Sequence, residues 1–255
     1  MFSTKTNRGK AFSLSYWISL FVLGISLLPF FLPGPAEGKE KYREVAVSKG
    51  AAIAGEAIFK GPPPEAYVFR VEKDTDVFGE VIPDERLIVS PAGKIKYVLV
   101  TIEGIMAGKP WPDLKPRVQN KGGRFIPHLQ AARTKTKLEI INEDPVLHNT
   151  HAIIKSRTLF NLSQPIQGQE IRKTLMRPGL VQIMCDTHDW MNAWIAVLDH
   201  PYYAITGEDG AYKINNIPAG TYKLTAWHEK LGRRQVEVTV KAGEETKLNF
   251  EFPAE

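Results

Sequence analysis

Cysteine is the scarcest informative residue of this sequence. The chain has 255 residues and a single cysteine, Cys185. One cysteine excludes an intramolecular disulfide framework and a zinc site built from cysteines alone. The chain also lacks a strong charge of either sign, because 33 Lys and Arg residues against 28 Asp and Glu residues leave a formal net charge of +5. Without basic clusters, this small excess does not favour a nucleic-acid partner.

Signatures of common hydrolases are missing too. The sequence contains neither Gly-x-Ser-x-Gly, found in many serine hydrolases, nor His-Glu-x-x-His, found in many zinc proteases. It has 6 histidines in all, too few for the several histidine pairs of a multicopper oxidase. A nucleophilic Cys185 with His188 as its base is an alternative that the residues leave open. We nevertheless expect a protein that is not an enzyme.

The first 38 residues have the order of an export signal. Three basic residues within the first ten precede an uncharged apolar run over residues 16–33, and small residues follow it. The run is also barely long enough to span a bilayer core of roughly 30 Å. Residues 1–38 are therefore predicted to be either a signal peptide or an N-terminal membrane anchor. In both cases the remainder is expected to be exported, to the periplasm or outside the cell.

Beyond residue 38 the sequence predicts an all-β protein. Short segments of alternating or β-branched residues recur between turns, as in a sandwich or barrel. No long amphipathic helix is evident, and only a helical turn over residues 156–162 is expected within this pattern. The predicted strands cover residues 52–59, 95–102, 137–142, 179–185, 194–198, 211–214, 221–227, 235–240 and 246–252.

We place a domain boundary near residue 199. Residues 39–199 end just after the segment with the only cysteine, and residues 200–255 carry four evenly spaced strands. About 55 residues are few for an independent sandwich, because a small domain buries too little surface. The second domain is therefore expected to pack tightly against the first.

The single cysteine lies in a motif with the character of a metal site. Cys185 is followed by His188 and Met191, at intervals of three residues, between two predicted strands. Thiolate, imidazole and thioether are soft donors, and with a second histidine they form a trigonal site with a weak axial methionine that suits copper. Zinc prefers four strong ligands and gains little from a thioether. The motif therefore favours copper over structural zinc.

The second histidine is expected after the predicted strand over residues 137–142. His148 and His151 both follow that strand, upstream of Cys185. They are three positions apart, so on an extended strand their side chains face opposite sides. Only one of the two is therefore predicted to be a ligand.

These residues resemble the ligand loops of the blue-copper cupredoxins. The run His148-Asn149-Thr-His151, upstream of Cys-x-x-His-x-x-Met, is similar to the cupredoxin pattern, and the spacing of the second loop is that of amicyanin. The similarity covers residues 138–198. It implies a Greek-key β-sandwich that binds one type 1 copper ion.

The resemblance also implies a role for each residue. The copper ligands would be His148, Cys185, His188 and Met191. Asn149 would tie the two ligand loops together, and His151 would lie beside the site without binding the metal. In cupredoxins the electron commonly leaves through the exposed edge of the later histidine, here His188. Trp190 would lie either in the docking patch around that edge or in the core.

An exported electron carrier is the function that the resemblance implies. A type 1 copper with four protein ligands transfers single electrons and has no open position for a substrate. The expected partner is another exported redox protein, such as a cytochrome c or a membrane oxidoreductase. The alternatives are a copper carrier and an envelope module that binds glycans or proteins.

Residues 204–224 carry a second resemblance. Their sequence, from Ala-Ile-Thr-Gly-Glu-Asp-Gly to Ala-Gly-Thr-Tyr-Lys-Leu, is similar to carboxypeptidase regulatory-like domains, which are small immunoglobulin-like or transthyretin-like sandwiches. This likeness implies a fold and little about function. Four aromatic residues are predicted to form its core rather than a sugar-binding face: Tyr202, Tyr203, Tyr222 and Trp227.

Three histidines lie outside both motifs. They are His128, His200 and His228, and we predict structural roles for them near the junction of the two domains. A second metal site, completed by Asp199 or Glu229, is the alternative.

Overall fold

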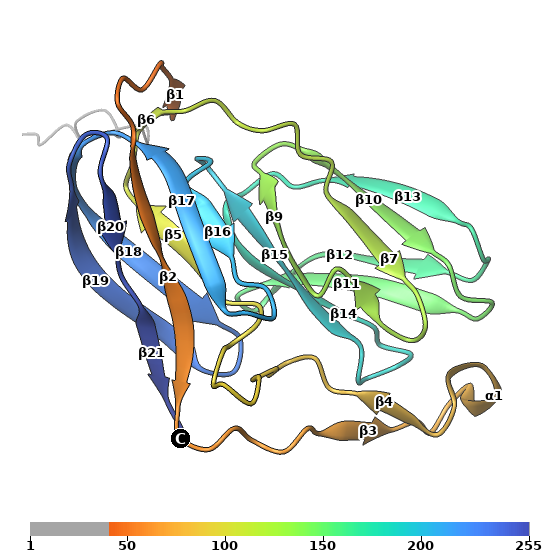
Figure 1. Cartoon of the computed structure of the whole chain (residues 1–255). Coiled ribbons are helices and arrows are strands. Elements are labelled where there is room, and N and C mark those ends of the chain that lie inside the picture. The colour runs from red at the N-terminus through yellow and green to blue at the C-terminus, as the bar shows by residue number, and fades with distance from the viewer. Residues whose placement is uncertain (1–40, 255) are drawn as a thin grey trace, which may run out of the picture. The chain divides into compact units, whose positions relative to one another are not determined.

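A computed structural model of the chain describes residues 41–254 (Figure 1). The signal or anchor predicted over residues 1–38 lies outside these described residues. Strands dominate the described part, and its one helix, α1 (Thr75–Phe78), is a single turn. Within residues 41–254 no helix has the length and apolar character needed to cross a membrane. The predicted all-β fold class is confirmed.

Two sheets form a first sandwich, which carries the cysteine motif. One sheet has four strands, in the order β13 (Glu170–Thr174), β10 (Lys137–Asn142), β7 (Arg117–Asn120) and β8 (Phe125–Ile126). The other has five strands, in the order β12 (Arg157–Gln164), β11 (His148–Ile154), β14 (Gly179–Met184), β15 (Asn192–Leu198) and β9 (Leu129–Arg133).

The alternation of side chains along the strands builds the core of this sandwich. In β10, Leu138 and Ile140 are fully buried, whereas Glu139 and Ile141 are only partly buried. Successive side chains of a strand point to opposite faces, so this pattern turns one face of the sheet inward. Leu138 and Ile140 pack in one cluster with Ile183 and Ile195 of the facing sheet.

A second pair of sheets forms a second sandwich. One has the strand order β16 (Tyr203–Ile205), β5 (Leu99–Glu103), β18 (Gly220–His228) and β19 (Gly232–Val240). The other has the order β17 (Ala211–Ile217), β2 (Ala51–Lys60) and β20 (Glu245–Lys247), and β21 (Phe250–Pro253) also pairs with β2. Ile53, Val100 and Leu224 are fully buried in the core between these sheets. Tyr202 and Tyr222 belong to this core or pack against it, as predicted for the aromatic residues.

The second sandwich is assembled from both ends of the described chain. The strands β2 and β5 precede the first sandwich in sequence, yet each occupies an interior position among the C-terminal strands. Figure 1 shows the orange strand β2 beside the blue strands. The predicted division at residue 199 therefore does not follow the sheets. Buried backbone N–H and C=O groups must be hydrogen-bonded. Those of the C-terminal strands β17 and β18 pair with the earlier strands β2 and β5.

The two sandwiches meet through a smaller apolar cluster. Leu99 of β5 packs there with Leu129 and Ala196 of the first sandwich. The indole rings of Trp194 and Trp227 meet edge to face with their centroids 5.0 Å apart. The prediction that Trp227 and Tyr203 belong to the core of the second domain is therefore wrong, because both pack in the junction cluster.

Between β2 and β5 the chain makes an excursion along the first sandwich. It contains the antiparallel pair β3 (Val68–Arg70) and β4 (Val81–Pro83), with α1 between them. Ile82 and Phe78 pack on the core of the first sandwich and anchor the excursion. The strands β1 (Arg43–Glu44) and β6 (Ala107–Gly108) form a separate short parallel pair.

Strand predictions were most accurate where apolar residues alternate cleanly. The strand predicted over residues 137–142 coincides with β10, whereas the segment 246–252 is divided between β20 and β21. The helical turn predicted over residues 156–162 is wrong, because residues 157–162 belong to β12. This strand pairs with β11 alone and leaves most of its side chains exposed, so it needs few apolar residues.

Candidate metal centre

Antiparallel pairing of β11 with β14 brings the two sequence motifs to one end of the first sandwich. His148 is the first residue of β11, and Cys185 directly follows the last residue of β14. Because the strands run in opposite directions, with His151 opposite Met184, the start of one lies beside the end of the other. His188 follows in the loop that leads to β15.

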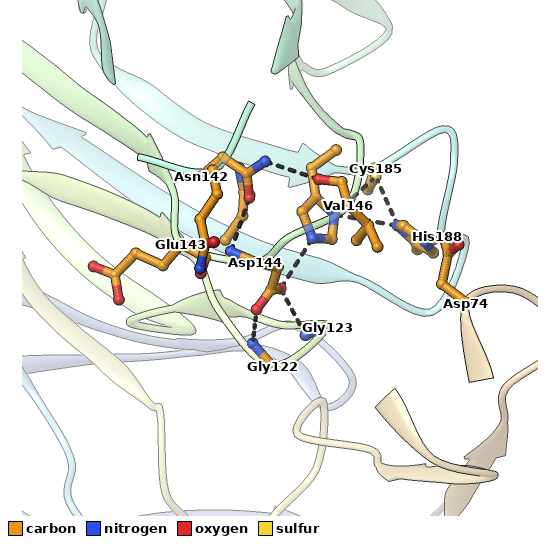
Figure 2. Close-up of polar contacts among 12 residues, drawn as sticks. Asp74, Gly122, Gly123, Asn142, Glu143, Asp144, Val146, Cys185 and His188 are labelled. Atoms are coloured by element: carbon orange, nitrogen blue, oxygen red, sulfur yellow. Dashed lines mark hydrogen bonds and ion pairs between the residues drawn. The ribbon is translucent and has the colours of Figure 1, made fainter. Parts of the chain in front are cut away.

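Three side-chain atoms converge at this end. Nδ1 of His148 and Nδ1 of His188 are 3.1 Å apart, and Sγ of Cys185 is 3.8 Å from each nitrogen (Figure 2). All three residues are buried, and both histidines are 0% exposed. A point equidistant from the three atoms lies about 2 Å from each, which is the length of a bond from a metal ion to nitrogen or sulfur. The triangle thus has the size to hold one metal ion.

Met191, the fourth predicted ligand, lies in the same buried cluster as Cys185. It is 2% exposed, and the loop turns back toward it because its backbone N–H donates to the carbonyl oxygen of His188 at 3.0 Å. Its thioether is therefore placed in the core at this end of the sandwich. The triangle itself contains the other three predicted ligands.

Asn149 connects the two loops that carry the triangle. Its Oδ1 accepts hydrogen bonds from the backbone N–H groups of Asp186 at 2.7 Å and Thr187 at 3.2 Å. Its own backbone N–H donates to Sγ of Cys185 at 3.5 Å. These contacts are the ones expected of a residue that ties the first histidine to the cysteine loop.

Burial and hydrogen bonding oppose each other at the three site residues. Burial disfavours the thiolate of Cys185, but hydrogen bonds from His148 and from the backbone N–H of Asn149 outweigh it and lower the pKa of the thiol. Burial likewise disfavours charge on His148, but Asp144 and Cys185 outweigh it and raise the pKa of that imidazole. Burial lowers the pKa of His188, although Asp74 opposes it. The site therefore favours a thiolate, which is the form that binds metals.

A carboxylate contacts the outer nitrogen of each histidine. Nε2 of His148 lies 3.0 Å from Oδ2 of Asp144, and Nε2 of His188 lies 2.8 Å from Oδ2 of Asp74. Phe78 of α1 meets the ring of His188 edge to face, with the centroids 5.3 Å apart. The expectation that His188 presents an exposed edge is therefore wrong. A segment more than 100 residues earlier in the chain covers that edge.

His151 points away from the triangle, as its three-residue spacing from His148 predicts. Its Nδ1 lies 2.9 Å from Oδ1 of Asp186, and its Nε2 lies 2.8 Å from Oγ1 of Thr158. Asp186 also accepts from Nδ2 of Asn149 at 2.8 Å. His151 thus contacts the cysteine loop from outside through that carboxylate.

Trp190 lies in the core next to the site. It is 8% exposed, and its Nε1 donates to the carbonyl oxygen of Gly123 at 2.9 Å. Its ring lies 5.1 Å from the ring of His188, centroid to centroid. Of the two places considered for Trp190, the structure shows the core.

The three remaining histidines lie apart from the triangle. His128 pairs with Glu229, and burial lowers the pKa of both His200 and His228. Among the described residues, the triangle is the only group of three or more histidine, cysteine or carboxylate side chains close enough to hold a metal ion. The described part of the chain therefore offers no second site of that kind.

Sequence reasoning did not identify Asp74, Phe78 or Asp144. Asp144 lies four residues before His148 in the same loop, so its position could have indicated a partner for that histidine. Asp74 and Phe78 lie in the excursion between β2 and β5, with no local signal that relates them to the cysteine motif. Only the path of the chain brings them there.

Two comparisons with known proteins extend this description. Residues 176–248 match the family described as polysaccharide lyase family 4, domain II. This match spans the cysteine loop and most of the second sandwich, and it covers less than half of the chain. The comparison with curated proteins finds no match.

Several solved structures of copper proteins resemble parts of the chain. They include a copper-containing nitrite reductase from Thermus scotoductus SA-01, at 25% identity over 35% of this chain and 24% of that one. A purple cupredoxin from Nitrosopumilus maritimus is 20% identical over 33% of this chain and 100% of that one. An amicyanin mutant in its Cu(I) form is 16% identical over 39% of this chain and 98% of that one. All three have a TM-score of 0.30, so the likeness by itself decides neither fold nor function.

Proposed function

We propose that this chain holds one copper ion between His148, Cys185 and His188 and uses it to carry single electrons. The observation that supports this most directly is the buried triangle of two Nδ1 atoms and one Sγ atom, 3.1 to 3.8 Å apart. Two imidazoles and one thiolate are the strong ligands of a blue-copper site. When bound, copper supplies a one-electron couple between Cu(II) and Cu(I).

The surroundings of the triangle favour copper over zinc. Met191 is buried in the same cluster, and a weak thioether ligand suits copper. Structural zinc takes four strong ligands. The carboxylates of Asp74 and Asp144 contact the outer nitrogens of the histidines. Over residues 41–254, the group of His, Cys and carboxylate side chains close enough to hold an ion consists of His148, Cys185 and His188 alone.

The residues around the triangle suit electron transfer better than catalysis. Both histidines are 0% exposed, which suits a buried site for electron transfer better than one that a substrate must reach. Asn149 and the two carboxylates hold the loops and rings in place, which limits rearrangement when the charge of the ion changes. We therefore propose that the protein is a carrier and not an enzyme.

The proposed setting is the periplasm or the outside of the cell. The order of basic, apolar and small residues over residues 1–38 is that of a signal peptide or membrane anchor. An exported redox protein, such as a cytochrome c or a membrane oxidoreductase, is the proposed partner.

Two other functions have less support. A copper carrier exchanges its ion readily, whereas the three donor residues here are at most 2% exposed. The support for a glycan-binding role is the family match over residues 176–248. However, Tyr202 is fully buried and Trp227 packs on Trp194, so these aromatic residues are not available to stack on a sugar.

Titration of the full chain with Cu(II), followed by visible absorption, tests the proposal. We expect an intense thiolate-to-copper band that saturates at one equivalent and that disappears in Cys185→Ala. His148→Ala should also lose it, whereas the matched variant His151→Ala should keep it, because His151 lies outside the triangle. The band should bleach and return through reversible one-electron reduction. A colourless protein, or one that binds Zn(II) more tightly than copper, would contradict the proposal.

A further inference from the structure

The two histidines of the triangle share one arrangement. In both, Nδ1 faces the triangle and Nε2 faces an aspartate oxygen, at 3.0 Å for His148 and 2.8 Å for His188. An ionised carboxylate only accepts hydrogen bonds, so each Nε2 must carry the proton. In the neutral form of each ring, which is the form that binds a metal, the lone pair is then on Nδ1.

Asp144 is held in place by its own loop and by a glycine turn. Its two oxygens accept from the backbone N–H groups of Gly122 at 2.7 Å and Gly123 at 3.1 Å (Figure 2). Both glycines have positive φ, at 59° and 64°, which lets consecutive N–H groups point at one carboxylate. The side chain of Asp144 is 8% exposed. Its negative charge is therefore fixed and poorly screened by water.

Asp74 reaches the site from outside both sandwiches. It precedes α1 with φ 54° and ψ 41°, a left-handed conformation that aspartate tolerates better than most residues. Its carboxylate contacts His188, and its side chain is 29% exposed. The site thus receives one carboxylate from the loop before β11 and another from the excursion.

We propose that Asp74 and Asp144 are positioning residues that fix the orientation of the two imidazoles and bias the bound ion toward Cu(II). This inference rests on the proposed copper site. With the thiolate of Cys185, the two carboxylates place three negative charges around one ion. A doubly charged ion gains more from that field than a singly charged one, so the midpoint potential is held low. Carboxylates behind ligand histidines also raise their basicity and their affinity for metal.

Isosteric variants of the full chain test this role. Asp144→Asn and Asp74→Asn keep the size of each side chain and remove its charge. We expect each variant to keep the visible band and to raise the midpoint potential. A tenfold greater loss of Cu(II) affinity than of Cu(I) affinity corresponds to 59 mV. The larger shift is expected for Asp144→Asn, because that carboxylate is the more buried of the two.

Asp76→Asn is the matched control. Asp76 lies in the first turn of α1, two residues from Asp74, and its replacement by Asn removes the same charge. It should leave the potential near the wild-type value, because it has no hydrogen bond to either ring among those in the structure. An unchanged potential in Asp74→Asn, or an equal shift in Asp76→Asn, would overturn the inference. Asp74→Asn remains informative even if Asp144→Asn does not fold.

Affinity for Zn(II) separates this inference from the proposed function. Zn(II) alone, titrated into the full chain, probes the two nitrogens and the sulfur without any copper chemistry. Loss of an outer carboxylate typically costs 10–100-fold in metal affinity, and we expect a decrease of that order for Asp74→Asn and Asp144→Asn but not for Asp76→Asn. This result would support the positioning role even if no blue band forms. Equal Zn(II) affinity in all three variants would exclude it.

Discussion

At the scale of single residues, His228 shows how burial alone changes the chemistry of a side chain. It is 1% exposed, and burial lowers its pKa from 6.5 to about 4. Its Nδ1 accepts from the backbone N–H of Lys230 at 3.2 Å, which the neutral ring can do. The folded protein therefore holds His228 neutral at a pH where the unfolded chain would protonate it.

A pH dependence of stability follows from this histidine. Its contribution is fully present above pH 6.5, and it is lost as the pH falls toward about 4, because the unfolded chain binds the proton first. The free energy of unfolding should fall by about 3 kcal/mol across this window from His228 alone. Urea unfolding at several pH values measures it. His228→Gln, which cannot titrate, should flatten the profile, and an unchanged slope in that variant would refute the assignment.

At the scale of elements, the alternation of side chains along β11 places two histidines of one motif on opposite faces of the strand. His148 faces the core and contributes to the triangle, whereas His151 faces the outside and contacts Asp186 and Thr158. A strand reverses the direction of its side chains at each step, so residues three apart lie on opposite faces. The alternation that builds the sandwich therefore also decides which histidine can face a metal.

The excursion that carries α1 acts as a cover over His188. Phe78 lies 5.3 Å from the ring of His188 and 5.9 Å from the ring of His148, centroid to centroid. Phe78 is itself only half-buried, so it stands between the triangle and solvent. In the proposed role of electron carrier, this segment lies on the route of an electron that leaves through His188.

Removal of the Phe78 ring should therefore change electron exchange. In copper-loaded Phe78→Ala we expect faster oxidation by hexacyanoferrate(III) and a stability loss of about 2 kcal/mol, below the cost of a fully buried phenylalanine. Val77→Ala is the control, because Val77 is 37% exposed on the same turn. Stopped-flow kinetics compares the second-order rate constants. Equal rates in the two variants would show that α1 does not shield the site.

At the scale of the whole molecule, one buried carboxylate joins the two sandwiches. Glu229 directly follows β18 of the second sandwich and pairs with His128 of the first. Its Oε2 also accepts from Nδ2 of Asn192 at 2.7 Å and from Nε1 of Trp194 at 3.0 Å. Three donors of the first sandwich thus depend on one acceptor of the second.

Glu229→Ala should destabilise the protein strongly. The buried ring of His128 and the half-buried donors of Asn192 and Trp194 would lose their acceptor, and we expect a loss of about 3 kcal/mol. Glu237→Ala on the exposed face of β19 is the control and should cost at most about 0.5 kcal/mol. Urea unfolding of the copper-loaded protein, followed by circular dichroism and by the visible band, measures both variants. Equal midpoints for the two variants would contradict a structural role for Glu229.

The sequence by itself determined the local features of this protein. Alternating residues such as those of β10 predict strands, because a buried face requires an apolar residue at every second position. The interval of three between Cys185 and His188 was likewise sufficient to indicate a compact loop with two donors. The separation of His148 from His151 followed from strand geometry alone.

Only the tertiary structure decided which distant segments meet. The pairing of β2 and β5 with the C-terminal strands joins residues more than 100 positions apart, as does the contact of Asp74 with His188. Such contacts depend on the packing free energy of the whole chain, and no local pattern records it. Local spacing therefore identified candidate donors, whereas the long-range path of the chain decided which of them lie together, which carboxylates support them and what covers them.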